Sequence, residues 1–318
     1  MKLTSIILTF GTSLVASVFA GTEAPIMTTN SCEAADGFAA ARRPMSNPTL
    51  FDLAVPRTNA HAIYIHQSLP STVATAGGGS VDLDGSFDLY ALQLEYALSE
   101  RLSIVATKDG YVDFNPDATL SESHGFANLA GGLKYAFIFQ PENGLAVSGT
   151  ATVEIPTGSG DITQGSGDGA INLIATGLKI NGPLQLAGAA GVHVPFDNDA
   201  SSTSSFVSTH VSYEVHRLFT PLVELNWYHV INEGDGGSRY SNQLGGAVPG
   251  TIGFEGGDLL NWGASNGKDN ADIVTLAAGF RSQLSDNLSA GAAYEIPLTD
   301  ENENFMESRI TVDLIWNF

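Results

Sequence analysis

The sequence predicts an all-β protein, a closed antiparallel transmembrane β-barrel of about twelve strands. Three observations predict this fold. The chain opens on a secretory signal, runs of about ten residues then alternate apolar and polar side chains, and these runs are joined by breaks that are alternately short and long. A closed barrel accounts for all three, because its strands leave no unpaired edge in the lipid.

Residues 1–20 match a signal peptide. Lys2 precedes a largely apolar stretch, and Val18, Phe19 and Ala20 offer small or modest side chains before a cleavage point. The stretch is too short and too interrupted for a spanning helix. We therefore divide the chain into a signal peptide (1–20), an N-terminal periplasmic segment (21–57) and a transmembrane β-barrel (58–318).

The composition favours an amphipathic barrel over a helical membrane protein. The chain is 43% hydrophobic and 15% charged, and no later segment approaches the roughly 18 consecutive apolar residues of a spanning helix. Cys32 is the only cysteine, which excludes an internal disulfide. The net charge is −21, and many acidic residues fall in the long breaks. Such an acidic rim repels nucleic acid and indicates cations or neutral solutes over anions.

The alternating runs are the predicted strands, clearest at residues 90–98, where Tyr90, Leu92 and Leu94 share one face. The twelve runs are 58–68, 86–98, 101–112, 125–138, 144–155, 169–180, 183–195, 205–217, 219–231, 272–283, 287–297 and 308–318. The longest break between them is 232–271. Outer-membrane barrels have short periplasmic turns and long extracellular loops, so we expect both chain ends on the periplasmic side.

The last predicted strand ends the chain on an aromatic residue. One face carries Ile310, Val312, Leu314, Trp316 and Phe318, and the other carries Thr311, Asp313, Ile315 and Asn317. We expect the apolar face to meet lipid, and the strand to pair with the first strand and close the sheet. A terminal strand ending in phenylalanine resembles the signal that the barrel-assembly machinery recognises in outer-membrane proteins of Gram-negative bacteria. The predicted localisation is the bacterial outer membrane.

The polar residues of these strands are expected to point into the lumen. The lumen-lining candidates are Glu95, Lys134, Glu154, Lys179, His210, Glu214, Glu224, Arg281, Glu295, Arg309 and Asp313. Mixed charges either pair to plug a small barrel or line a narrow aqueous channel, and the sequence leaves both open. Gly132, Gly191, Gly279 and Gly291 at inward positions leave room, and the unequal numbers of acids and bases favour the channel.

His210 and Ser212 form the one arrangement in the sequence that suggests a catalytic site. Outer-membrane phospholipases and lipid deacylases use a His-x-Ser pair on a strand, and Asn226 on the next strand is a candidate to orient the imidazole. Those enzymes act on lipid from the outer face, whereas this pair shares its face with Ser208 and Glu214. We therefore predict no catalytic residues and no enzyme. The other histidines lack metal-ligand spacing, so no metal and no other cofactor is predicted.

The middle of the chain resembles the outer-membrane transporter family known as the MetA pathway of phenol degradation. The resemblance rests on GFANLAGGLKYAF (125–137), on VEIPTGSGD (153–161) and on the strand–turn rhythm up to about residue 230. It implies a barrel for passage or export of small molecules, and it carries no catalytic residues. It does not account for residues 21–57 or for the 232–271 loop.

We therefore expect a porin-like channel or transporter for small solutes, surrounded by outer-membrane lipids and lipopolysaccharide. A structural or adhesion-type barrel that acts through its extracellular loops is the alternative, and a lipid-modifying enzyme is third. The 232–271 loop could carry such activity or fold inward as a constriction. The sequence does not indicate the oligomeric state.

Overall fold

The computed structural model describes residues 36–75, 78–165, 167–234, 255–257, 259–260, 270–300 and 304–318. The predicted signal peptide and Cys32 lie outside these residues. No helix within these ranges is long and apolar enough to cross a membrane.

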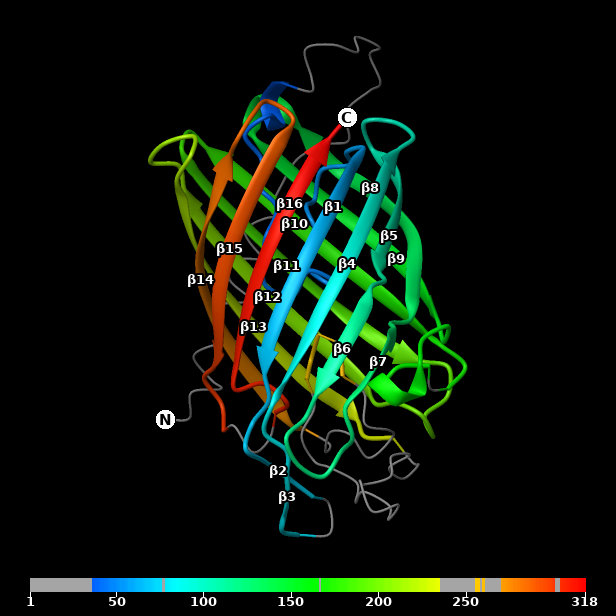
Figure 1. Cartoon of the computed structure of the whole chain (residues 1–318). Coiled ribbons are helices and arrows are strands. Elements are labelled where there is room, and N and C mark those ends of the chain that lie inside the picture. Colours follow the sequence, from blue (N-terminus) through cyan, green and yellow to red (C-terminus); the bar gives the residue numbers. More distant parts are fainter. Residues whose placement is uncertain are drawn as a thin grey trace.

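The described strands form a closed antiparallel barrel of twelve strands, which confirms the predicted fold class (Figure 1). Ten are continuous: β1 (Asn59–Ser68), β4 (Ser86–Ala97), β9 (Leu145–Ile155), β10 (Ala170–Asn181), β11 (Leu184–Pro195), β12 (Thr203–Tyr213), β13 (Thr220–Asn232), β14 (Asp272–Gln283), β15 (Leu288–Pro297) and β16 (Ser308–Asn317). β1 pairs with β4 on one side and with β16 on the other, so the last strand closes the sheet as expected.

Each of the other two strands is built from two pieces. β5 (Leu102–Lys108) and β6 (Tyr111–Asn115) both pair with β4, while β7 (Ser123–Phe126) pairs with β6 and β8 (Leu129–Gln140) with β5. The first break is local. Gly110 has a φ of 125°, and the Asp109 carboxylate accepts the Leu92 N–H at 3.0 Å. The predicted strands 101–112 and 125–138 are therefore interrupted, which alternation alone does not show.

Short elements lie in the connections. They are η1 (Asp36–Phe38), η2 (Pro141–Asn143), η3 (Gly160–Ile162) and a hairpin of β2 (Thr72–Ala74) and β3 (Ser80–Asp82), which the sequence did not predict as strands. Figure 1 shows η1, the short turns and Phe318 at one end of the barrel and the long connections at the other. We call the first the periplasmic end, in line with the predicted orientation.

The outer face of the barrel is apolar. On β16, Ile310, Val312, Leu314 and Trp316 are exposed, while Thr311, Asp313 and Ile315 are buried, as the alternation predicts. On β4, Leu92, Leu94 and Tyr96 are exposed in the same way. Large apolar side chains arrayed around a closed sheet are the surface that a bilayer solvates.

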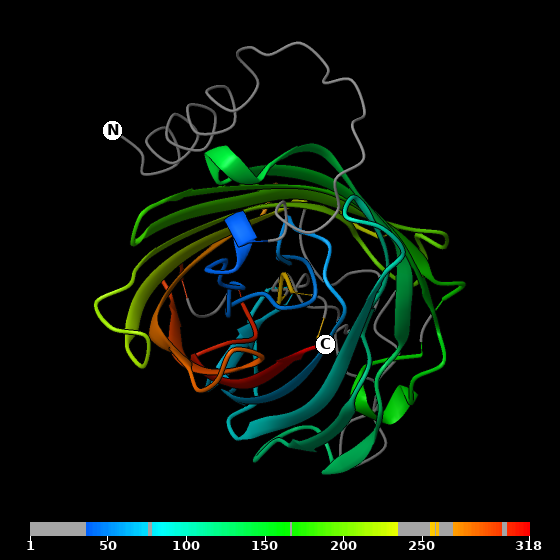
Figure 2. The same ribbon diagram turned by 90° about the horizontal axis from the view of Figure 1, so that it is seen from above.

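The predicted periplasmic segment is 21–57, of which the structure describes residues 36–57; residues 41–57 are mostly buried inside the barrel, and Gly37, Ala39 and Ala40 are exposed at its rim (Figure 2). We call residues 36–57 the lumen segment. From η1 the chain enters at the periplasmic end and reaches Pro48, whose carbonyl accepts a hydrogen bond from Gln93 at 2.9 Å. It then turns back and enters β1 at Asn59. Buried polar atoms need partners, and the barrel wall supplies them here.

Two apolar clusters fill much of the lumen. In the first, Phe38, Leu50, Phe51 and other residues of the lumen segment pack against β9–β12, on Ala146, Ile174, Leu178, Ala187, Ala189 and Phe206. In the second, inward residues of β1, β4 and β6, such as Ile65, Phe87 and Phe114, pack against Leu259, Leu260 and Phe305 from long loops. Fully burying such side chains stabilises the fold by about 1.5–3 kcal/mol each.

The inward glycines do not leave the room that the sequence indicated. A β carbon on Gly132 would lie 1.9 Å from the Ala151 carbonyl oxygen, so this glycine is needed for close approach of two strands. The space beside Gly291 holds Met45 of the lumen segment, whose Sδ would lie 2.7 Å from an added β carbon. The glycines therefore favour close packing and not an open pore.

Candidate functional site

The lumen holds nearly all of the predicted lumen-lining residues. Glu95, Lys134, Glu154, His210, Glu224, Arg281, Glu295, Arg309 and Asp313 are buried there, and the Glu214 side chain is 40% exposed at the periplasmic mouth. Lys179 was assigned wrongly. It is exposed on the face opposite Leu178, and its ammonium donates to the Asn143 carbonyl at 2.5 Å. β10 is apolar on both faces, so its phase cannot be read from alternation.

The first cluster of charges joins the lumen segment to β4 and β8. Lys134 Nζ lies 2.5 Å from an oxygen of Asp52 and 2.9 Å from one of Glu95, and Arg43 forms a second ion pair with Asp52. Burial alone would raise the pKa of Asp52, but the charges of Arg43 and Lys134 outweigh it and hold that pKa well below its usual range. Asp52 is therefore a firm ionic anchor for the lumen segment.

Glu224 on β13 is the second anchor. It accepts the backbone N–H groups of Met45 at 2.9 Å and Ser46 at 2.6 Å, and the Ser46 hydroxyl at 2.5 Å. Its other neighbour is His210, whose Nδ1 lies 2.6 Å from Glu224 Oε1. A buried carboxylate with this many donors is fully satisfied, so the segment and the wall form one polar network.

His210 and Ser212 belong to this network. His210 Nε2 lies 2.9 Å from the Ser212 hydroxyl, so Ser212, His210 and Glu224 form a chain with the geometry of a serine nucleophile relay. Asn226 does not orient His210; it donates to Ser46, Thr275 and Glu295. Glu224 could have been found from register, because it stands directly opposite His210. The Ser212 hydroxyl is covered by Arg42, which donates to it at 3.1 Å.

Three further groups of ion pairs lie in the lumen. Arg281 holds Asp313 through two hydrogen bonds of 3.0 and 2.8 Å, and Lys108 lies 2.7 Å from Glu154. Towards the long loops, Arg309 pairs with Glu255 of the 232–271 loop and with Glu295 at 3.5 Å. Within the described ranges, no three His, Cys, Asp or Glu side chains are grouped so that they could hold a metal ion.

Charges in the lumen are nearly balanced, contrary to the imbalance that the sequence indicated. Among the described residues, the buried bases are Arg42, Arg43, Lys108, Lys134, Arg281 and Arg309, and the buried acids are Asp52, Glu95, Glu154, Glu224, Glu255, Glu295 and Asp313. The chain has only 13 Lys and Arg residues against 34 Asp and Glu. Almost the whole net charge of −21 therefore lies elsewhere in the chain.

The lumen segment supplies functional residues that sequence reasoning missed, namely Arg42, Arg43, Ser46 and Asp52. None belongs to an alternating run, so the strand pattern carries no signal for them. The useful signal is compositional. Two adjacent arginines precede the largely apolar stretch LFDLAV (50–55), which is unusual in a chain with so few basic residues.

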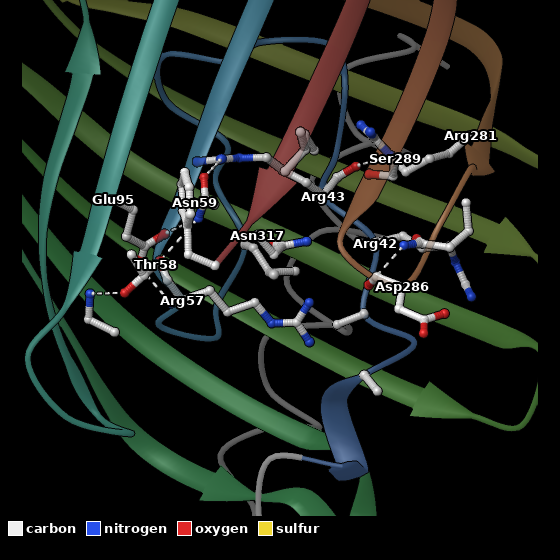
Figure 3. A pocket seen from close by; sticks show the side chains of 17 residues that line it. Arg42, Arg43, Arg57, Thr58, Asn59, Glu95, Arg281, Asp286, Ser289 and Asn317 are labelled. Carbon is white, nitrogen blue, oxygen red and sulfur yellow. Dashed lines mark hydrogen bonds between the residues drawn. The ribbon is translucent and has the colours of Figure 1, made fainter.

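A cavity of about 410 Å³ lies at the periplasmic end, between the lumen segment and the ends of β1 and β14–β16. Arg42, Arg43, Arg57 and Arg281 line it together with Glu95, and Asp286 and Phe318 also border it. Figure 3 shows that the arginines come from both the lumen segment and the wall. Pockets of this size hold small molecules.

The chain is similar to one protein family and to solved outer-membrane proteins. The family model described as "Putative MetA-pathway of phenol degradation" matches residues 63–309. The COG4313 outer membrane channel from Pseudomonas putida F1 is similar in structure, with a TM-score of 0.57 and 15% identity over 83% of this chain and 96% of that one. The NanC porin has a TM-score of 0.48 and 8% identity over 82% of this chain and 100% of that one. No curated protein matches.

At this identity the first of these structures shows the fold alone. The closed sheet, the apolar outer face and the shared fold together make this chain a β-barrel of the bacterial outer membrane.

Proposed function

Since the chain belongs to the family described as "Putative MetA-pathway of phenol degradation", we propose that it is a porin-like channel or transporter for small solutes, closed in this conformation by residues 36–57. The observation that carries the proposal is the polarity of the wall behind the lumen segment. Gln185, Ser208, Ser212, Glu224 and Asn226 all face it from β11–β13.

The contact between the segment and the wall is part polar and part apolar, because the segment also packs on Ile174, Leu178 and Phe206 of β10 and β12. Polar wall residues gain little from the segment compared with water, because each hydrogen bond to the segment replaces one that water would make. The ion pairs also contribute little net stability, because the desolvation cost of burying two charges is about as large as their mutual attraction. Withdrawal of the segment would leave a passage lined by polar residues such as Ser208, Ser212 and Asn226 on one side and by the apolar residues of β9–β12 on the other.

A structural or adhesion-type barrel is the second candidate. The filled lumen and its paired charges favour it, because such a barrel needs no passage. Residues 255–257 and 259–260 lie in the lumen, so at least this part of the 232–271 loop faces inward and not toward an extracellular partner.

The decisive experiment locks the lumen segment. Asn226 Nδ2 donates to Ser46 Oγ at 3.0 Å, so the pair Ser46→Cys and Asn226→Cys, in a Cys32→Ser background, is the candidate disulfide between the segment and the wall. In planar bilayers we expect ion conductance when the pair is reduced and loss of conductance when it is oxidised. The two single-cysteine variants are the controls, and their conductance should ignore the oxidant. A protein silent in all states would support the structural barrel.

We also propose that the protein is not an enzyme. Ser212 is only 2% exposed, and its hydroxyl is covered by Arg42. The carbonyl group of a substrate therefore has no path to this hydroxyl. Purified protein should not hydrolyse phospholipid. Hydrolysis that Ser212→Ala abolishes would overturn this.

The remaining partners are likewise proposals. Outer-membrane lipids and lipopolysaccharide would surround the apolar face, and the barrel-assembly machinery would read the terminal strand. The residues concerned are Ile310, Val312, Leu314, Trp316 and Phe318, all exposed on one face.

A further inference from the structure

We propose that the periplasmic cavity is a binding site for a small organic anion, such as a carboxylate, with the Arg57 guanidinium as its main donor. The cavity belongs to the described wall and lumen segment, so the site exists while the segment is in place. Interpreting its ligand as a transported solute rests on the proposed function, but the binding itself does not.

Arginine is concentrated at this cavity. Four guanidinium groups line it in a chain that has only 13 basic residues, and they come from the lumen segment (Arg42, Arg43, Arg57) and from β14 (Arg281). Guanidinium groups present several N–H donors in one plane, which match the two oxygens of a carboxylate. A cavity built this way selects ligands by charge.

Three of these arginines already have carboxylate partners. Arg42 pairs with Glu214, Arg43 with Asp52 and Arg281 with Asp313. Arg57 differs: its guanidinium donates to a neutral acceptor, the Phe38 carbonyl, and it takes part in none of the ion pairs found among the described residues. Figure 3 shows its guanidinium between the labelled lining residues.

The positive charge is under-compensated as well as concentrated. Burial lowers the pKa of Arg57, and the charge of Glu95 offsets this only in part. Burial lowers the pKa of Arg42 too, with Glu214 opposing and Arg281 adding to the effect. A guanidinium whose cationic form is penalised in this way gains from a bound anion, because the ligand supplies the missing counter-charge.

Two acids also line the cavity. The Glu95 oxygens accept from Lys134, Ser103 and the Arg57 backbone N–H, so Glu95 is already neutralised. Asp286 is exposed in a short turn, where solvent screens it. Glu95 therefore acts on Arg57 through its charge and accepts no hydrogen bond from the Arg57 guanidinium, whose partner is the Phe38 carbonyl.

The rest of the lining suggests the body of the ligand. Leu53, Ile315 and Phe318 contribute apolar surface, and Thr58, Asn59 and Asn317 add neutral polar groups. A compact anion with an apolar body fits both features within about 410 Å³. The acidic loops at the far end of the barrel favoured cations as solutes. Those exposed charges are screened beyond a Debye length of about 8–10 Å, so they have little effect at this cavity. The arginines, in contrast, would contact the ligand directly.

The test is titration calorimetry on the full-length protein in detergent, with benzoate as the anion and benzamide as its neutral counterpart. We expect benzoate to bind at least about tenfold more tightly than benzamide, and Arg57→Gln to weaken benzoate about 10- to 100-fold, the range for a lost charged hydrogen bond. Arg101→Gln, an arginine at a short turn outside the cavity lining, is the matched control and should bind benzoate as the wild type does.

Equal binding of benzoate and benzamide to the wild type would overturn the proposal, as would undiminished benzoate binding by folded Arg57→Gln. If Arg57→Gln does not fold, the wild-type comparison of benzoate with benzamide decides by itself. A protein that binds benzoate but conducts no ions would refute the proposed channel and leave this site standing.

Discussion

Ser46 donates both its backbone N–H and its hydroxyl to the same oxygen of Glu224, at 2.6 and 2.5 Å. Ser46 lies at the middle of the lumen segment and Glu224 at the middle of β13, so the contact fastens the deepest part of the segment to the wall. Three of the Glu224 contacts come from the segment's backbone and hydroxyl groups and one from His210. This carboxylate therefore has the largest influence on whether the segment stays inside.

We predict that Glu224→Gln loosens the lumen segment without unfolding the barrel. The glutamine amide removes the negative charge and directs its own N–H donors at the donors of the segment. Each charged hydrogen bond lost in this way costs about 1.5–3 kcal/mol. Hydrogen exchange of residues 42–49 should accelerate about tenfold or more, and channel open probability should rise. Glu142→Gln, at an exposed carboxylate in η2, is the control. Unchanged exchange in Glu224→Gln would contradict the assigned anchor.

Lys134→Met should destabilise the folded barrel by about 3–5 kcal/mol, because it leaves Asp52 and Glu95 buried without their shared ammonium. The temperature at which the folded band disappears on detergent gels should fall. Lys179→Met, at an exposed lysine outside the lumen, should change stability by no more than about 0.5 kcal/mol. A second change, Glu95→Gln, should recover part of the loss in Lys134→Met, since it removes one stranded charge.

The Asp52 anchor should resist acid. The pKa of Asp52 is held below its usual range, so its contribution to stability is complete above the unfolded pKa of about 3.9 and is lost only as the pH falls through the lower folded pKa. Protease access to the lumen segment should therefore be the same at pH 7 and pH 5 as far as Asp52 is concerned. Asp52→Asn should raise access at both values. A wild-type anchor lost near pH 5 would show that Asp52 is not its source.

Phe318→Asp should impair insertion far more than it changes the stability of barrels already folded. Phe318 is 71% exposed and its ring stacks on Trp316, with ring centroids 4.9 Å apart, so the folded state loses little packing. Outer-membrane levels should fall while the melting of purified, refolded protein is nearly unchanged. Phe219→Asp, at an exposed aromatic residue in another periplasmic turn, is the control. Equal levels of the two variants would show that the terminal residue is not read.

The barrel was predictable because its signal is local and repeated. The alternation of apolar and polar residues with period two was enough to predict the twelve strands and which face of β16 meets lipid. In the structure, the pairing register of β12 and β13 sets Glu224 opposite His210. β10 shows the limit of the method: its apolar residues occupy both faces, so Lys179 was assigned to the wrong one.

The position of the lumen segment could not be predicted from the alternation of apolar and polar residues. Its contacts join residues far apart in the chain, such as Arg43 with Arg281, whose guanidinium donates to the Arg43 carbonyl at 3.1 Å. Nothing in the residues next to Arg43 encodes that partner. The predicted charge imbalance failed for the same reason, because Arg42, Arg43 and Asp52 were not counted among the lumen charges.

The path of the lumen segment makes it a loop with both ends at one opening. Phe38 packs beside Phe139 near the turn that follows β8, and Thr58 accepts the backbone N–H of Phe318 at the same end of the barrel. The segment is therefore not threaded through the barrel, and no free end has to pass along the lumen. The proposed opening therefore requires no strand pair to separate, including β1 with β16, when the segment leaves towards the periplasm as one piece. The same topology allows the segment to enter after the barrel has closed.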